Sequence, residues 1–260
     1  MIRQMLISDP SFTVKDSVFF QKNFDANKFE SAYVSIREKE GRLLNDAMVI
    51  NLPDLPTSHR HSKEWKIRKE SSERLIRYLK KTGASKHILE VGCGNGWLSN
   101  QFTEIPGADV VGLDINTIEL KQAARVFSNK PNLTFVASSV FSLQPRYKFD
   151  YIILASSIQY FPDLRGLLLQ LQQQLSNGGE VHILDSPLYN QESVLEAKVR
   201  STKYFDSQHS SMNTHYHHHS WDALSSFNYT VPYDPKRTLT RIRNKFRTGS
   251  PFPWIIVKKV

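Results

Sequence analysis

A carboxylate followed by closely spaced glycines stands near the middle of the chain. Residues 90–96 read Glu-Val-Gly-Cys-Gly-Asn-Gly. Glycine adopts backbone angles that other residues resist, and it has no side chain to hold a ligand at a distance. Because Glu90 and Asn95 place polar groups beside these glycines, the run is typical of a turn that lies closely against a polar ligand.

A second carboxylate, Asp114, follows the next apolar stretch. We interpret residues 86–91 and 109–113 as two neighbouring strands, and the continuous apolar run at residues 151–154 is typical of a strand buried on two faces. A carboxylate at the end of the second strand can accept hydrogen bonds from both hydroxyls of a ribose. The two motifs therefore predict a nucleoside-bearing ligand at the carboxyl edge of a parallel sheet.

Apolar stretches and helical stretches alternate on both sides of these motifs. We predict strands at residues 86–91, 109–113, 133–136, 151–154 and 180–184, with helices at 97–104, 117–128 and 164–175. Strands separated by helices indicate βαβ units and a parallel sheet with helices on both faces. Residues 226–231 and 254–257 are two further strands without a long helix between them, and we expect them to form an antiparallel pair. The expected fold class is α/β, a Rossmann-like doubly wound sheet of seven strands, mostly parallel.

The amino-terminal part has a different character. We predict helices at residues 31–44 and 63–81, the second ended by Gly83, and a proline-containing loop at 52–59. The expected organisation is a helical extension or lid over residues 1–70, followed by a catalytic domain over residues 71–260.

The ordered motifs at residues 89–96, 112–115, 149–163 and 175–184 resemble those of class I S-adenosylmethionine-dependent methyltransferases of the small-molecule type. This resemblance implies S-adenosylmethionine as cofactor and S-adenosylhomocysteine as product. The glycine loop would lie under the methionine part, and Asp114 would hold the ribose. The residues expected to bind the cofactor are Glu90, Gly92, Cys93, Gly94, Asn95, Gly96, Asp114, Ile115, Ser139, Val140, Ala155 and Arg68.

One position departs from the family pattern. Many relatives carry an aspartate near the adenine amino group, where this chain has Ala137 to Val140; the Ser139 hydroxyl or the Val140 backbone would meet the adenine edge instead. A nicotinamide-binding domain is the nearest competing interpretation. Its fingerprint requires Gly-x-Gly-x-x-Gly, whereas residue 97 is Trp.

In this family, residues 155–160 lie where the cofactor meets its substrate. Methyl transfer requires mainly alignment of the reactants, with a general base where the acceptor carries a proton. Tyr160 and His182 are our leading catalytic candidates, although Tyr160 also suits an aromatic wall and His182 a helix-facing position. Further base candidates are Asp185, His215, His217, His218 and His219. Adjacent histidines cannot all converge on one ion, so we expect an exposed polar segment and no metal site.

The amino-terminal segment also offers candidates for covering the cofactor. If it lies across the open end of the sheet, Tyr33, Trp65 and Arg68 would line the site. The planar guanidinium of Arg68 suits the cofactor carboxylate.

Composition narrows the class of acceptor. The net charge of +9 favours acidic ligands only modestly, and the single cysteine excludes an internal disulfide. No apolar stretch is long enough for a signal peptide or a membrane span, so we expect a cytoplasmic protein. We expect it to be a monomer or a homodimer. The fourth strand lacks the Asn/Asp-Pro-Pro-aromatic motif of adenine methylases, and Cys93 lies in the cofactor loop rather than where the nucleophile of a cytosine methylase would be. We therefore predict methyl transfer to an O, N or C atom of a small molecule. A non-catalytic cofactor-binding protein and an RNA-directed enzyme using basic residues 236–247 remain open.

Overall fold

The computed structural model describes residues 2–24, 27–81, 86–144, 146–208, 210–244 and 249–259. Within these residues one sheet of nine strands has the order β1-β2-β5-β4-β3-β6-β7-β9-β8. Its five central strands are parallel; they are β3 (Lys86–Val91), β4 (Ala108–Asp114), β5 (Leu133–Ala137), β6 (Phe149–Ala155) and β7 (Leu175–Leu184). β9 (Trp254–Lys258) pairs antiparallel with both β7 and β8 (Tyr229–Tyr233). The predicted α/β class, the mostly parallel sheet and the antiparallel carboxyl-terminal pair are confirmed.

The prediction of seven strands is wrong, because an amino-terminal hairpin extends the sheet. β1 (Phe12–Lys15) pairs antiparallel with β2 (Val18–Gln21), and β2 pairs parallel with β5. Asp16 and Ser17 make the tight connection, with φ of 51° and 61°, the positive values that two-residue hairpin turns require. The strands have only four residues each, and the turn lacks the usual glycine, so the sequence pattern gave no clear signal.

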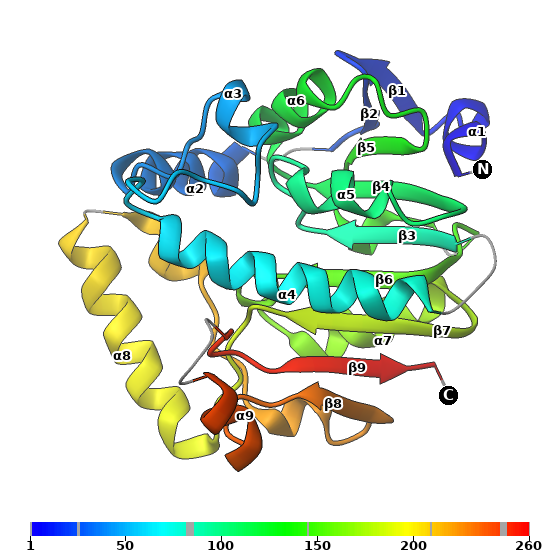
Figure 1. Ribbon diagram of the computed structural model, residues 1–260. Helices are drawn as coiled ribbons and strands as arrows, with labels where there is room; N and C mark the ends of the chain where they lie inside the picture. The colour runs from blue at the N-terminus through cyan, green and yellow to red at the C-terminus, as the bar shows by residue number, and fades with distance from the viewer. Residues whose placement is uncertain are drawn as a thin grey trace.

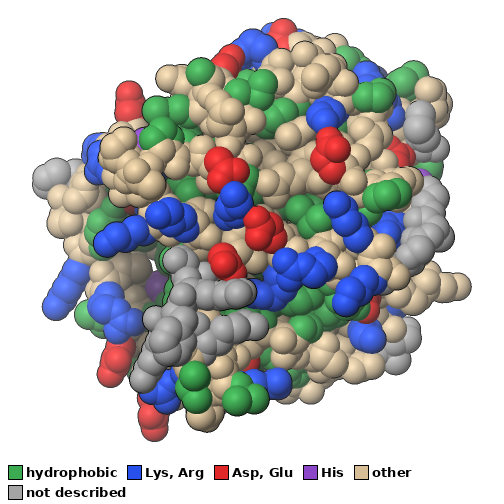
Figure 2. All heavy atoms as spheres, viewed as in Figure 1, with side chains coloured by type: hydrophobic (Ala, Val, Ile, Leu, Met, Phe, Trp, Pro, Cys, Tyr) green, Lys and Arg blue, Asp and Glu red, His purple; other side chains and the backbone are tan. Residues whose placement is uncertain are grey.

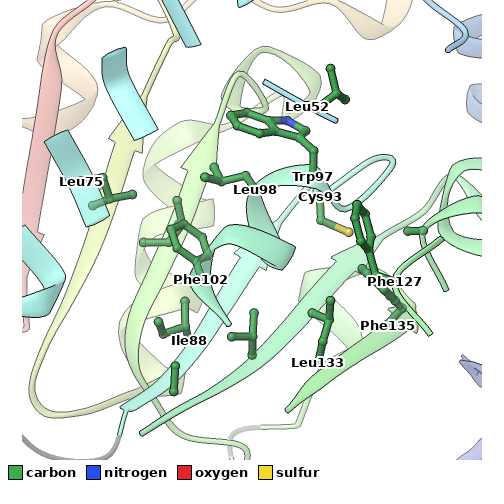
Figure 3. Close-up of a cluster of buried hydrophobic side chains, with 14 of the residues drawn as sticks. Leu52, Leu75, Ile88, Cys93, Trp97, Leu98, Phe102, Phe127, Leu133 and Phe135 are labelled. Atoms are coloured by element: carbon green, nitrogen blue, oxygen red, sulfur yellow. The ribbon is translucent and has the colours of Figure 1, made fainter. Parts of the chain in front are cut away.

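Side chains alternate between the two faces of each strand, and helices cover both faces (Figure 1). One face packs against α4 (Ser62–Lys80), α5 (Trp97–Phe102) and α6 (Thr117–Val126). The other packs against α1 (Ile2–Ser8) and α7 (Leu164–Gln174). Figure 3 shows the first of these layers, where Trp97, Leu98 and Phe102 of α5 lie with side chains of the strands beneath. The doubly wound arrangement therefore places the strand ends at an edge that no core helix covers.

The helices differ from prediction mainly outside this core. α2 (Asn27–Lys39) begins and ends earlier than the expected 31–44, and α3 (Asp46–Val49) follows it. α8 (Gln191–Ser207) was not predicted, because only two of its residues, Ala197 and Phe205, are buried and the sequence shows no apolar stripe. α9 (Thr238–Asn244) is a short helix in the basic segment. The predicted boundary at residue 70 falls within α4, and Gly83 lies outside the described residues.

Candidate active site

The glycine loop turns sharply at the carboxyl end of β3. Gly92, Gly94 and Gly96 have φ of 77°, 52° and 73°, in the left-handed region that favours glycine. The Gly92 amide donates to the Leu113 carbonyl at 2.8 Å, which ties the loop to the neighbouring strand. A Cβ on Gly96 would lie 2.7 Å from the Phe135 ring, so this glycine serves packing of the loop against the core.

Asp114 holds the loop from the end of β4. Its Oδ2 accepts a hydrogen bond from the Gly94 amide at 2.7 Å, and its Oδ1 accepts one from the Asn116 amide at 2.8 Å. Burial raises the pKa of this carboxyl, and these two amides oppose the rise. The predicted pairing of glycine loop and second-strand carboxylate therefore exists as a direct contact.

A cavity of about 770 Å³ opens over the loop. Its lining combines the loop with α4, with the segments after β6 and β7, and with residues of α2 and α8. Of the expected site residues, the lining includes Glu90, Gly92, Cys93, Gly94, Asn95, Ala155, Tyr160 and Arg68. Tyr33 and Trp65, predicted to cover the site, also line it.

A cap formed by α2, α8 and the 3-10 helix η3 (Ser211–His215) closes one side of this cavity. Figure 1 shows α2 and α8 beyond the end of the sheet toward which β3 and β7 point. Tyr204 of α8 donates a hydrogen bond to the Glu40 carboxylate, and Lys39 Nζ donates to the Gln208 carbonyl at 2.6 Å. Phe205 also belongs to a small core that joins the three helices.

Buried charges line the floor near the loop. Glu90 is 2% exposed and accepts a hydrogen bond from the Ser99 hydroxyl at 2.5 Å, and burial raises its pKa to about 8. Arg68 donates from Nε and Nη2 to Glu64 Oε1 at 3.1 and 3.0 Å, and it lies over the Trp65 ring. One edge of the guanidinium is therefore already held by Glu64.

Glu119 and Arg37 also line the cavity, and sequence reasoning missed both. Glu119 is 6% exposed on α6, and burial raises its pKa to about 7 against the opposing field of Arg37. The spacing in the sequence could have identified Glu119. Residues 119 and 123 lie on the same face of the helix, and Ala123 on that face is fully buried. A carboxylate on such a face indicates a ligand or a buried partner.

Aromatic side chains form the opposite wall. The ring of Tyr160 lies edge-on to Tyr33 and Tyr216, with centroids 5.5 and 6.0 Å away. Gln159 beside it is 9% exposed; its Nε2 donates to the Ser156 carbonyl at 2.7 Å, while its buried Oε1 accepts no hydrogen bond from the described residues. Burial raises the pKa of Tyr160, which keeps its hydroxyl protonated.

Asp185 directly follows β7 and lines the same cavity. Its Oδ1 accepts hydrogen bonds from Ser71 Oγ at 2.7 Å and Ser250 Oγ at 3.1 Å. Asp185 and Ser156 both have positive φ, 49° and 53°, which is uncommon for residues other than glycine. Burial raises the pKa of this carboxyl against the field of Arg68. The candidate base is therefore fixed in position and lines the cavity.

The histidine segment is part of the wall and differs from the expected exposed loop. His219 is 7% exposed, and its Nε2 lies 2.9 Å from the Ile158 carbonyl. The His217 amide donates to the Gln159 carbonyl at 2.7 Å, and His218 lines the cavity. The expectation of an exposed segment is therefore wrong for His219, because the segment anchors the turn that carries Tyr160.

Six expected residues are not among the described residues that line the cavity: Gly96, Asp114, Ile115, Ser139, Val140 and His182. Gly96 and Asp114 instead shape and hold the loop. His182 is fully buried and its Nδ1 accepts a hydrogen bond from Trp254 Nε1 at 3.1 Å, so the structure places it within the sheet and helix layers. Ser139 Oγ accepts a hydrogen bond from the Phe141 amide at 3.3 Å, and Val140 is 2% exposed. Ile115 is partly buried directly after Asp114. The structure does not bring His182 together with the loop.

The face seen in Figure 2 carries Lys and Arg interspersed with Asp and Glu. The basic run at residues 236–247 lies partly outside the described residues, and its described part includes α9. No helix in the described parts of the chain is long and apolar enough to cross a membrane.

Comparison with known proteins identifies a family for the part of the chain that contains the glycine loop. A family model for a methyltransferase domain matches residues 82–240. Malonyl-[acyl-carrier protein] O-methyltransferase 2 of Ilyobacter polytropus is 27% identical over 114 residues, which cover 44% of this chain and 44% of that protein. The ubiquinone biosynthesis O-methyltransferase of Photorhabdus laumondii is 32% identical over 114 residues, covering 42% and 47%. The chain thus matches less than half the length of these relatives.

Solved structures resemble the fold over a longer stretch. The magnesium protoporphyrin IX methyltransferase of Synechocystis, solved with bound S-adenosylhomocysteine, has a TM-score of 0.58 at 13% identity and covers 90% of this chain and 97% of its own. The geranyl diphosphate C-methyltransferase of Streptomyces coelicolor has a TM-score of 0.53 at 12% identity, covering 82% and 84%. At these identities the likeness concerns the fold alone.

The parallel sheet, the glycine loop and the second-strand carboxylate define an α/β protein of the class that binds a nucleoside-bearing cofactor at its strand ends. Within that class, the matched family model describes a methyltransferase domain. The chain belongs to the methyltransferase-domain family, among the class I S-adenosylmethionine-dependent methyltransferases.

Proposed function

We propose that this protein transfers the methyl group of S-adenosylmethionine to an O, N or C atom of a small-molecule acceptor. The observation that carries the proposal is the single cavity of about 770 Å³ that joins Gly92 and Gly94 to the wall around Tyr160. Ligand cavities commonly measure roughly 300 to 1,000 Å³. The cavity therefore has room for a cofactor and for at least part of an acceptor.

The residues present fit this cofactor. A positive φ at Gly94 and the absence of a Cβ leave the backbone open to the cavity. Asp114 carries one amide bond on each carboxylate oxygen, and each oxygen has a further lone pair for a ribose hydroxyl. Arg68 and Arg37 supply positive charge for the methionine carboxylate, and the Glu90 carboxyl offers an oxygen acceptor for the ammonium.

S-adenosylmethionine supplies an activated methyl group whose leaving sulfur needs no proton. The remaining work belongs to the protein, which aligns the acceptor with that methyl group and excludes water. Tyr160 and Tyr216 form an apolar wall for the acceptor, and Gln159 offers a polar atom within it. Asp185 is our candidate for removing a proton from an acceptor hydroxyl or amine.

Calorimetry with S-adenosylmethionine tests the first step. We expect binding at millimolar affinity or tighter, and the absence of such binding would contradict the proposal. Transfer of a labelled methyl group to a metabolite extract tests the second step. Cofactor binding without any transfer would favour a non-catalytic cofactor-binding protein instead. The names of the relatives refer to malonyl-[acyl-carrier protein] and to ubiquinone biosynthesis, so the extract should include malonyl thioesters and intermediates of quinone biosynthesis.

A further inference from the structure

Glu119 faces the cofactor loop from the first turn of α6. A Cβ placed on Gly94 would lie 3.3 Å from Glu119 Oε2, so the carboxylate stands directly over the loop. Oε2 accepts a hydrogen bond from Asn116 Nδ2 at 3.0 Å. Asn116 is 1% exposed, and its Oδ1 accepts the amides of Ile118 and Glu119, each at 3.1 Å. The carboxylate is therefore fixed in position at the cavity.

The charge of Glu119 has no close partner in the described part of the chain. Oε2 receives the Asn116 amide, and no donor among these residues reaches Oε1. Arg37 of α2 and Arg68 of α4 contribute favourable fields, but Arg68 pairs with Glu64, and neither arginine forms an ion pair with Glu119. A buried carboxylate without an ion pair is costly, so the site is complementary to a ligand that brings positive charge.

The two forms of the cofactor differ in this respect. S-adenosylmethionine carries a permanent positive charge on sulfur, and S-adenosylhomocysteine has a neutral thioether at the same place. Their adenosine, ammonium and carboxylate groups are alike. A group that interacts with the sulfonium therefore changes the ratio of the two affinities, whereas a group that contacts a shared part changes both affinities together.

We propose that Glu119 makes the site prefer S-adenosylmethionine over S-adenosylhomocysteine by interacting with the sulfonium charge. The inference rests on the proposed function, since it presumes that the cavity binds this cofactor. Loss of the methyl group removes the charge that Glu119 stabilises. Glu119 thereby favours exchange of the used cofactor for a fresh one.

The direct test compares both ligands by calorimetry on the unmodified protein, on Glu119→Gln and on the control Glu104→Gln. Glutamine keeps an oxygen for Asn116 but removes the charge. We expect Glu119→Gln to weaken S-adenosylmethionine several-fold while leaving S-adenosylhomocysteine nearly unchanged. Glu104, a carboxylate on the surface that pairs with Lys130, should leave the ratio unaltered when replaced.

Two results would overturn the inference. Equal weakening of both ligands would place Glu119 on the ribose or the amino acid part, and no change in either would show that the carboxylate does not contribute. If neither ligand binds the unmodified protein, the proposed function itself fails, which is a distinct outcome. Glu119→Asp keeps the charge, so the preference should survive in it.

A second measurement needs no variant. Burial raises the pKa of Glu119 to about 7 against the field of Arg37, so the free carboxyl binds a proton in part near neutral pH. A sulfonium nearby favours the ionised form, so binding of S-adenosylmethionine should release more protons than binding of S-adenosylhomocysteine. The other titratable and charged groups around Glu119 are present for both ligands; they are Arg37, Arg68, Asp114, Tyr33, Tyr160 and Cys93. Calorimetry in two buffers of different ionisation enthalpy counts the protons, and equal release would contradict the inference.

Discussion

Replacement of Gly94 by alanine adds a methyl group to the cofactor loop. It should have two effects, strain in the backbone and obstruction of the cavity. The φ of Gly94 is 52°, and an L-residue in this region costs roughly 1–2 kcal/mol of backbone energy. The added Cβ would also lie 3.3 Å from Glu119 Oε2, tighter than an ordinary contact. The first effect lowers stability, and the second alters the cavity.

The structure provides a matched control for the backbone effect. Gly178 has φ of 74°, and a Cβ there would meet no atom within 4 Å. Gly94→Ala and Gly178→Ala should therefore both lose roughly 1–2 kcal/mol of stability, which lowers the melting temperature by about 2–8 °C in a chain of this size. Only the Gly94 variant places its methyl group where the cofactor would lie.

The affinity change follows from packing. An extra methyl group in a well-packed site typically costs about 1–3 kcal/mol, which corresponds to a loss of roughly 5- to 150-fold in affinity. Calorimetry with S-adenosylmethionine should show this loss for Gly94→Ala and unchanged affinity for Gly178→Ala. If Gly94→Ala is destabilised like its control but binds the cofactor normally, the loop does not cradle the ligand.

Three further changes test other parts of the structure. Trp254→Phe should lower the unfolding free energy by about 1–3 kcal/mol, because His182 loses a buried hydrogen bond, without changing cofactor affinity; a matching loss of affinity would link His182 to the site. Glu30→Gln should cost about 0.5–2 kcal/mol in denaturation experiments and speed amide exchange in α2, because the Glu30 carboxylate accepts the first amides of α6. Burial opposes ionisation of Asp9, but its hydrogen bonds, led by that from Tyr147, hold its pKa well below the usual range. That stabilisation is present above about pH 4 and is lost as pH falls toward the folded pKa, so the unfolding free energy of the unmodified protein should fall more steeply with acid than that of Asp9→Asn.

Two of these variants need specific comparisons. Unchanged or slower amide exchange in α2 of the Glu30 variant would contradict the role of Glu30 in joining α2 to the first turn of α6. A parallel pH dependence in the unmodified protein and the Asp9 variant would show that another carboxylate governs acid unfolding.

The sequence predicted the parts of the fold that depend on strong local patterns. Continuous apolar strands and the amphipathic α4 were found because burial on two faces or on one stripe leaves a clear periodicity. The sequence did not predict the β1–β2 hairpin or α8, because these elements are stabilised by contacts with residues far away in the chain. β2 is held by β5. α8 is held through Phe205, which packs with Ile36 of α2 and Met212 of η3. Neither set of partners can be inferred from a local window.

The residues of the candidate site also divide into those that local sequence patterns predict and those that they do not. Glu90, Asp114 and the glycines were found because a cofactor loop is contiguous in sequence and its carboxylate stands at a strand end. Glu119 and Gln159 were missed, because their importance depends on which way a helix and a turn face the cavity. His182 was expected in the site, but its register in β7 directs it toward Trp254.

The cap joins parts of the chain that are synthesised far apart in time. Glu40 lies ahead of the glycine loop, yet its partner Tyr204 follows the last parallel strand. Closing so long a loop carries an entropic cost that nearby contacts do not. During synthesis the cofactor loop and the five central parallel strands emerge before the cap can close over them. We therefore expect the cap to fold late and to open first. The amides of the cap, which covers the route into the cavity, should then show the lowest protection from hydrogen exchange.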